Sequence, residues 1–419
     1  MFRLKDTQHQ NTAEFLSSAI GIAEYYGFSS LEDAGKLPRP KEIVLANQPV
    51  KQIEKRRIPS AAECESEMTF ARRDERALVS AAKRCLSSLR DTGSRLLWRQ
   101  STGVSRERSN VPSVILELHV VGSSGAIAEA LLIVVADAIA AEAGIKQRVL
   151  SINSIGSTDS SNRYVRDIGV YLRKHIESIS PTLRPRVGDD PLGVLIQLIE
   201  RGHPATSRAP QSMEYLTEDE RRKFWNLLEY LEVFGLPYEL NPQVLGSRDC
   251  WVHSIFEIAA VDEETGARIL LAYGGRYDPL AARFSASQGG AGPADGVPAA
   301  VISIACEIHG KTSVKREERI APALYFAHLG PEARRRSLGV METLRKAEIP
   351  VYQSLLHERI AEQMEEAKKY AVPYILLMGH KEAMEGTILV REVATNSQDA
   401  VQLPELTNYL KRHRVVAVA

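Results

Sequence analysis

The segment 271–284, LAYGGRYDPLAARF, sets two glycines, a cation, an aromatic ring and an acid in five consecutive positions. Gly274 and Gly275 follow an apolar run, and adjacent glycines at such a point predict a tight turn. Arg276 and Asp278 come directly after them. A turn followed by two opposite charges is typical of a pocket floor, so both charges are candidates for ligand contact. The same two side chains could instead form a structural ion pair with each other.

Other side chains with reactive chemistry are scattered along the chain. The four cysteines form no CxxC pair, and the ten histidines form no HExxH or HxxxH pattern. Metal sites of these types need closely spaced ligands, so the sequence predicts no metal ion. Cysteines without such spacing predict reduced thiols in a cytoplasmic protein. His253 and His309 are isolated and are expected to be structural.

The chain carries 53 Lys and Arg against 53 Asp and Glu. A net charge of zero argues against a protein that binds nucleic acid through its overall charge, but it leaves local basic faces as candidates. Such clusters could meet RNA phosphates, or they could be solvated helix ends. The candidates are Arg334, Arg335, Arg336, Lys411, Arg412 and Arg414.

No apolar run reaches the ~20 uninterrupted residues that a membrane helix needs. The longest candidate, 126–145, contains Glu129, Asp137 and Glu142. It predicts a buried helix instead. The first ten residues are polar, so no signal peptide is expected.

Apolar periodicity and turn residues predict a mixed N-terminal region. Strands are expected at 111–122 and 147–156, and a hairpin is expected around the turn 262–266, DEETG. The segment 296–308 fits a strand or a buried helix. A loop-rich segment is expected at 35–67. Helices are expected at 12–28, in the second half of 68–90, and at 124–145, 160–179, 190–200 and 218–236.

Beyond about residue 320 the pattern changes to strands that alternate with helices at 332–347 and 358–370. This alternation predicts a small α/β domain with a partly parallel sheet. We therefore expect two domains, residues 1–320 and residues 321–419.

Five collinear blocks carry a resemblance to a known family. They read LSINSIGSTDSSNRYVRDIGVYL, DPLGVLIQLIE, FGLPYELNP, AYGGRYDPL and AKKYAVPYILLMGHKEAMEGTILVREV. Together they resemble histidyl-tRNA synthetase, a class II aminoacyl-tRNA synthetase, over nearly the whole chain. The resemblance implies an α+β fold, with an antiparallel class II sheet and helices followed by an anticodon-binding-like α/β domain. It also implies a homodimer.

Amino-acid activation needs groups that neutralise charge on ATP and hold the substrates in place. In the family's second motif, REFxQ follows an arginine-rich stretch and precedes a strand that ends here at 121–122. Counting back puts REFxQ on 111–115, VPSVI, so the arginine that would hold the α-phosphate is aliphatic. Arg106 and Arg108 lie just upstream and could substitute for it.

The family's third motif, PAxGFAxGxER, aligns with PAAVISIACEI. Its glutamate is kept as Glu307, but Ile308 replaces the arginine. Val301 and Ala305 replace the two glycines, whose lack of a side chain would admit the nucleotide. The sequence therefore predicts a filled adenine site.

Three further positions also depart from the family. The histidine-binding RGLDYY aligns with GSRDCW, which keeps Asp249, displaces the arginine by two residues to Arg248 and loses both tyrosines. Lys83 falls on the acid that would meet the substrate's amino group. The first motif's proline is missing after YGF.

We therefore predict a histidyl-tRNA synthetase paralogue that has lost aminoacylation and needs no cofactor. It would be a cytoplasmic homodimer that binds tRNA, another RNA or a protein partner. A regulatory subunit of a histidine-biosynthesis transferase is another degenerate member of this kind, but it lacks the anticodon-binding-like domain. The presence of that domain here favours an RNA partner.

Two alternatives remain open. The chain could be a divergent histidine–tRNA ligase that uses ATP and Mg²⁺ with the relocated Arg106, Arg108 and Arg248. The altered pocket could also bind a different small ligand, if Asp249, Arg276 and Glu307 converge.

Overall fold

The computed structural model describes residues 9, 11–31, 94–105, 111–247, 250–261, 266–281, 297–310, 321–413 and 415. The larger of two sheets has the strand order β1-β2-β3-β8-β7-β6-β4-β5. Its strands run antiparallel from β2 through to β4, and parallel pairs join β1 to β2 and β4 to β5 at the two edges. The predicted antiparallel sheet is confirmed. The strands are β1 Ser29–Ser30, β2 Arg95–Ser105, β3 Val111–Val121, β4 Arg148–Gly156, β5 Tyr238–Leu240, β6 Val252–Val261, β7 Arg268–Arg276 and β8 Ala299–Glu307.

Several α-helices accompany this sheet in the described part of the chain. Local signals fix several of their ends. In α8, Thr217 and Glu220 form a reciprocal capping box, and Gly235 ends the helix at φ 82°. Asp190 caps α7, whose first residue is Pro191. The helices are α1 Thr12–Tyr25, α4 Ile127–Glu142, α5 Thr158–Lys174, α6 Arg186–Asp189, α7 Pro191–Glu200 and α8 Glu218–Phe234, with short 3₁₀ turns at Ile176–Ser178, Pro204–Arg208 and Ser212–Tyr215.

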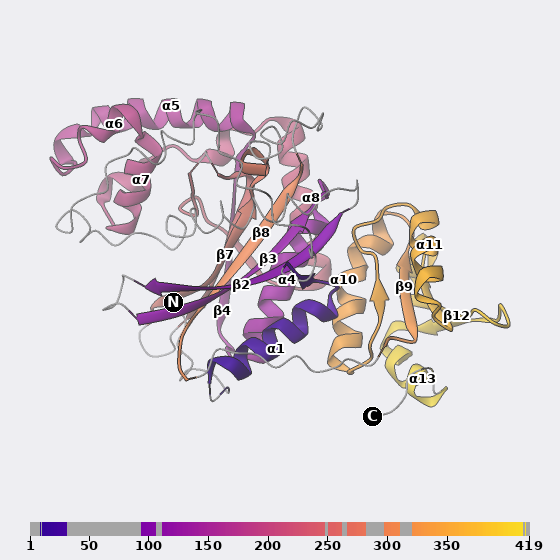
Figure 1. Cartoon of the computed structure of the whole chain (residues 1–419). Coiled ribbons are helices and arrows are strands. Elements are labelled where there is room, and N and C mark those ends of the chain that lie inside the picture. Colours follow the sequence, from indigo (N-terminus) through magenta and orange to yellow (C-terminus); the bar gives the residue numbers. More distant parts are fainter. Residues whose placement is uncertain are drawn as a thin grey trace, which may run out of the picture.

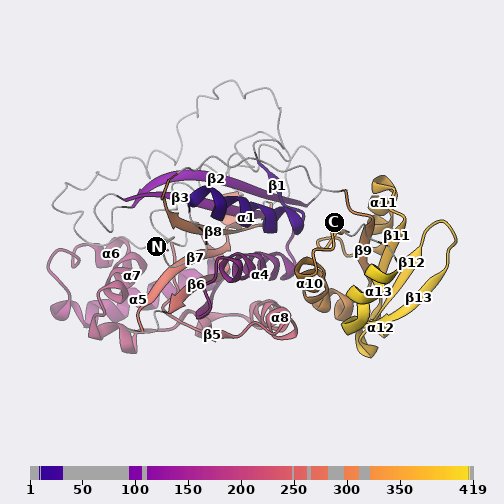
Figure 2. The same ribbon diagram turned by 90° about the horizontal axis from the view of Figure 1, so that it is seen from below.

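Both faces of the large sheet are covered. Side chains alternate between the faces of a strand, so Val114, Leu116 and Leu118 of β3 pack with α1, α4 and α8 in one core. The opposite face carries Val301 and Tyr273, which pack with α5 and α7 in a second core. Figures 1 and 2 show α5, α6 and α7 grouped at one end of the molecule, away from the C-terminal unit. We call the side of the sheet that carries this second core the α5–α7 face.

The C-terminal unit holds a five-stranded sheet in the order β10-β9-β11-β12-β13. The first three strands are parallel, and β12 and β13 are antiparallel to their neighbours. This confirms the predicted small α/β arrangement. Its elements are β9 Leu324–His328, α10 Pro331–Lys346, β10 Tyr352–Gln353, α11 Ile360–Tyr370, β11 Tyr374–Met378, α12 His380–Glu385, β12 Thr387–Glu392, β13 Gln398–Gln402, a 3₁₀ turn Leu403–Glu405 and α13 Leu406–Arg412.

Most of the expected elements are present, including the hairpin of β6 and β7, and 296–308 forms strand β8. The strands and helices that were not predicted include β1, β2, β5, α6, α12, β13 and α13. The expected loop at 35–67 and helix within 68–90 lie outside the described residues. The division at residue 320 stays a prediction. One hydrophobic core crosses it, since Leu324 and Phe326 of β9 belong to the same cluster as α1 and α4.

Gly274 is required by the close approach of β7 to its neighbours. A Cβ atom there would lie 2.2 Å from the carbonyl oxygen of Val301 and 2.7 Å from the ring of Phe256. We therefore expect Gly274→Ala to lower the free energy of unfolding by about 3 kcal/mol, because backbone cannot move aside as a flexible side chain can. Urea unfolding followed by circular dichroism measures this.

The control is Gly339→Ala in α10, where a Cβ would meet nothing within 4 Å. Alanine favours a helix over glycine by up to about 1 kcal/mol, so this variant should be unchanged or slightly more stable. Equal losses in the two variants would contradict the packing explanation.

Candidate functional site

The GGRYD residues lie at the end of a strand rather than in a turn. Gly274, Gly275 and Arg276 belong to β7, and neither glycine has a positive φ. The predicted tight turn is therefore wrong. The glycines are needed for space, because a Cβ on Gly275 would lie 2.5 Å from the carbonyl oxygen of Ser254. The two adjacent glycines therefore indicate tight strand packing and not a turn.

Arg276 is buried and makes its strongest contacts with Glu129 on α4. Its Nη2 and Nε donate to the two Glu129 carboxylate oxygens at 2.6 and 3.0 Å. Ser254 of β6 also donates to Glu129, at 3.1 Å, and the carbonyl oxygen of Ser123 accepts from Arg276 Nη1 at 3.2 Å. The predicted pair with Asp278 exists but is longer, at 3.5 Å. Helix α4 supplies the main partner that the sequence did not identify.

The electrostatics agree with a structural role for this arginine. Burial opposes the charge on Arg276, but Glu129 and Asp278 outweigh it and raise its pKa. Burial raises the pKa of Asp278, against the opposing effect of Arg276, and its carboxylate also accepts from Ala299 N at 2.8 Å. The donors of Arg276 therefore already face protein acceptors.

His253 lies beside this ion pair, at a bulge where β6 pairs irregularly with β4 and β7. Its φ of 57° is a strained conformation for a residue with a side chain. Burial lowers its pKa to about 4, with Arg276 adding to the effect, so the ring is neutral at pH 7.

The other remnant candidates do not join Arg276. In the register of β7 and β8, Arg276 lies opposite Ala300, whereas Glu307 lies seven residues further along β8, about 23 Å away. Convergence of Arg276 with Glu307 is therefore wrong. The Glu307 carboxylate lies 3.8 Å from His309 Nε2. Asp249, Arg248, Arg106 and Arg108 lie outside the described residues, as does Lys83.

The positions aligned with the family's glycines are filled and buried. Val301 is fully buried opposite Gly275 and His119, and Ala305 is buried opposite Ile115. Both lie on the α5–α7 face, since Val301 packs in the second core and Ala305 is four residues along the same strand.

A row of polar residues crosses the same face of the sheet. Directly paired positions on successive strands are Arg99, Glu117, Ser303, Tyr273 and Glu257. Burial raises the pKa of Glu117 to about 7, with Arg99 acting against it at 3.4 Å. Burial also raises the pKa of Glu257 to about 7, against the effect of Arg268.

The sequence contains a pattern that indicates this polar row. Glu117 and His119 stand two residues apart within the otherwise apolar strand VILELHVV. Alternation places them on one face together, and acids inside an apolar strand indicate a built polar site.

The first basic cluster, residues 334–336, is largely paired with acids. Arg334 contacts Glu358 at 2.5 Å, and its Nη2 donates to the carbonyl oxygen of Leu356 at 3.5 Å. Arg335 contacts Glu229 of α8 at 2.7 Å and Glu332 at 2.8 Å. Arg336 is exposed. Two of the three arginines thus hold α10 against its neighbours.

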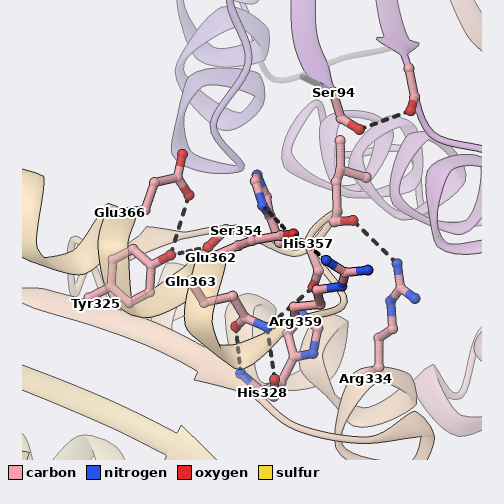
Figure 3. A network of polar contacts seen from close by, with 12 residues as sticks. Ser94, Tyr325, His328, Arg334, Ser354, His357, Arg359, Glu362, Gln363 and Glu366 are labelled. Atoms are coloured by element: carbon pink, nitrogen blue, oxygen red, sulfur yellow. Dashed lines mark hydrogen bonds and ion pairs between the residues drawn. The ribbon is translucent and has the colours of Figure 1, made fainter. Parts of the chain in front are cut away.

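The polar network in Figure 3 fixes the loop that Arg334 contacts. Gln363 of α11 is fully buried, accepts from His328 N and donates to His328 O, both at 2.9 Å. It also donates to the carbonyl oxygen of His357 at 3.2 Å. Tyr325 is hydrogen-bonded to Ser354. These contacts hold residues 354–357 in place.

The second basic cluster lies at the end of α13, where Lys411 and Arg412 are exposed. Arg414 lies outside the described residues. Lys411 borders an open groove of about 1180 Å³ between α1 and the C-terminal unit. The groove is also lined by Tyr352 and Tyr370, whose rings stack at 3.9 Å. Sequence patterns could not reveal this stack, because the tyrosines come from different elements.

No group of three or more potential metal ligands occurs in the described part of the chain. None of the helices described there is long and apolar enough to cross a membrane.

Comparison with known proteins agrees with the blocks found in the sequence. A family model described as an anticodon binding domain matches residues 325–413. Histidine–tRNA ligase 1 of Shouchella clausii is 26% identical over 295 residues, which are 70% of this chain and 68% of that protein. Histidine–tRNA ligase of Bacillus velezensis is 28% identical over the same shares. The crystal structure of apo S. aureus histidyl-tRNA synthetase aligns at TM-score 0.43 and 19% identity, covering 80% of this chain and 81% of that one.

We expect Arg276→Met to lower the free energy of unfolding by about 3–5 kcal/mol, because it leaves the Glu129 and Asp278 carboxylates buried without their cation. Urea unfolding at pH 7 measures the change. As the control, Arg166→Met removes an exposed pair with Asp167 and should cost less than about 1 kcal/mol. A loss for Arg276→Met no larger than the control's would show that the buried pair does not hold α4 to the sheet.

Proposed function

We propose that this chain, a histidyl-tRNA synthetase-like member of the class II synthetase family, binds tRNA or another RNA and does not join histidine to tRNA. The observation that carries the RNA partner is the anticodon-binding match over residues 325–413. Its C-terminal end contains the exposed Lys411 and Arg412. Two adjacent cations without an ion pair among the described residues suit contact with phosphates.

The loss of aminoacylation is supported by the positions that should hold ATP. Buried Val301 and Ala305 stand where the family has glycines, and Ile308 stands at an arginine position. Arg276 is committed to Glu129. These residues do not fit a nucleoside triphosphate. Such a ligand needs the protein backbone close to it and cations beside its phosphates.

The proposal includes a homodimer in the cytoplasm. A protein partner is the alternative to RNA as the molecule that this homodimer binds. The competing function is a divergent histidine–tRNA ligase that would use ATP and Mg²⁺. It would depend on Arg106, Arg108 and Arg248 taking over from the altered positions.

Histidine-dependent ATP–pyrophosphate exchange separates the two functions. We expect purified full-length protein with Mg²⁺ to exchange at less than about a thousandth of the rate of the Bacillus velezensis ligase, since loss of a single preorganised donor costs about 10²–10³ in rate. Exchange within tenfold of that enzyme would establish the ligase and exclude the binding role as the main one.

RNA binding is tested with a double variant, Lys411→Ala with Arg412→Ala. We expect affinity for bulk tRNA to fall, and the slope of log affinity against log salt to decrease by about 1.4, since each phosphate contact on single-stranded RNA contributes about 0.7. Filter binding between 50 and 200 mM salt gives the slope.

The matched control is Arg173→Ala with Lys174→Ala, which removes two exposed cations from the end of α5. It should leave the slope unchanged. Equal effects of the two double variants would indicate attraction by overall charge, without a site on α13.

A further inference from the structure

Two polar side chains on β3 are buried with unused hydrogen-bonding atoms. Glu117 is 1% exposed and His119 is fully buried. Glu117 Oε1 and His119 Nε2 have no hydrogen-bond partner among the described residues. A buried carboxylate oxygen without a donor is costly, so these atoms are available to a bound ligand.

Glu117 and His119 each use only part of their hydrogen-bonding capacity. Glu117 Oε2 meets Arg99 Nη1 at 3.4 Å, which is long for a charge-assisted bond. His119 Nδ1 lies 3.0 Å from the hydroxyl of Tyr277. Burial lowers the pKa of His119 to about 3, so the ring is neutral and offers Nε2 as donor or acceptor according to its tautomer.

The unused atoms belong to side chains on one face of the sheet. Glu117 and His119 are two residues apart on a strand, which puts their Cβ atoms about 7 Å apart on the α5–α7 face. Ser303 of β8 lies directly opposite Glu117 and is buried. A single small cationic group could therefore meet a carboxylate, a hydroxyl and an imidazole.

Beside this polar cluster the same face of the sheet is apolar, and at Ile115 it is less deeply buried. Ile115 and Ala305 pair directly, two residues further along β3 and β8 on the same face. Ile115 is only partly buried, whereas His119 is fully buried. Access from the Ile115 end would bring a ligand's charged head to Glu117 and leave its apolar body on the partly buried Ile115.

The charges also restrict the ligand. Within this row, Arg99 is already opposite Glu117, and the position aligned with the family's third-motif arginine is Ile308. A carboxylate or phosphate on the ligand would find no free cation in the row. We propose that β3 and β8 form a binding site for a small primary amine with an apolar body and no acidic group.

This site goes beyond RNA binding and does not depend on it, because α13 lies in the other unit. Isothermal titration of the full-length protein with phenethylamine at pH 8 tests it. We expect phenethylamine to bind at least about tenfold more tightly than phenylalanine, which adds a carboxylate, and than 2-phenylethanol, which lacks the charge. Equal binding of either analogue, or no binding of phenethylamine, would overturn the proposal.

Glu117→Gln should weaken phenethylamine binding at least about tenfold. Glu257→Gln is the matched control, because Glu257 has the same raised pKa on the same face but lies three strands away. If Glu117→Gln fails to fold, Ile115→Trp at a partly buried position should block the amine instead. Unchanged binding in the folded Glu117 or Ile115 variant, or equal loss in the Glu257 control, would place the amine elsewhere.

The pH dependence provides an independent readout. The groups that face Glu117 are Arg99 from β2, His119 from its own strand and the uncharged Ser303 from β8. His119 stays neutral between pH 6 and 8, because burial lowers its pKa to about 3. Binding should therefore follow deprotonation of Glu117 and tighten about tenfold over that range, since its pKa is about 7. A flat profile would overturn the assignment to Glu117.

Discussion

The ion pair between Arg276 and Glu129 ties together parts of the chain that are distant in sequence. It joins the end of β7 to helix α4, and it draws in Ser254 of β6 and the backbone of Ser123. All of these groups are buried, so the pair is held in a low-dielectric environment where an unmatched charge would be very costly. This one match of charges fixes the end of β7 against α4, on the face where α4 packs on the central strands through its apolar side chains.

Where the sequence pattern was strong and local, it predicted the structure. The apolar strand at 111–122, the helix at 218–236 and the alternation beyond residue 320 all appear as expected. Strand β2 was missed because RLLWRQSTGVS mixes polar and apolar residues without clear alternation. The short elements β13 and α13 depend on packing in the C-terminal unit, where tertiary contacts outweigh local preference.

The candidate site was harder to predict, because its residues meet only through strand register. The charge pair at 276 and 278 was found from sequence, but its main partner lies on a helix 147 positions away. Glu307 looked like a neighbour of Arg276 until the pairing of β7 with β8 separated them. Conversely, Arg99, Glu117 and Ser303 come from three strands and form one row that no spacing in the sequence shows.

The C-terminal unit is joined to the rest by more than a connecting segment. Tyr25 donates to the carbonyl oxygen of Ile349, Tyr26 to Glu342 and Gln353 to the carbonyl oxygen of Tyr26. Buried side chains of β9 and α10 continue the core of α1 and α4 without a break. The unit is therefore not a detachable module. Truncation before β9 would uncover apolar surface on α1 and α4, so loss of the tail in evolution would require compensating changes in the larger sheet's helices, and its retention here follows from folding as well as from function.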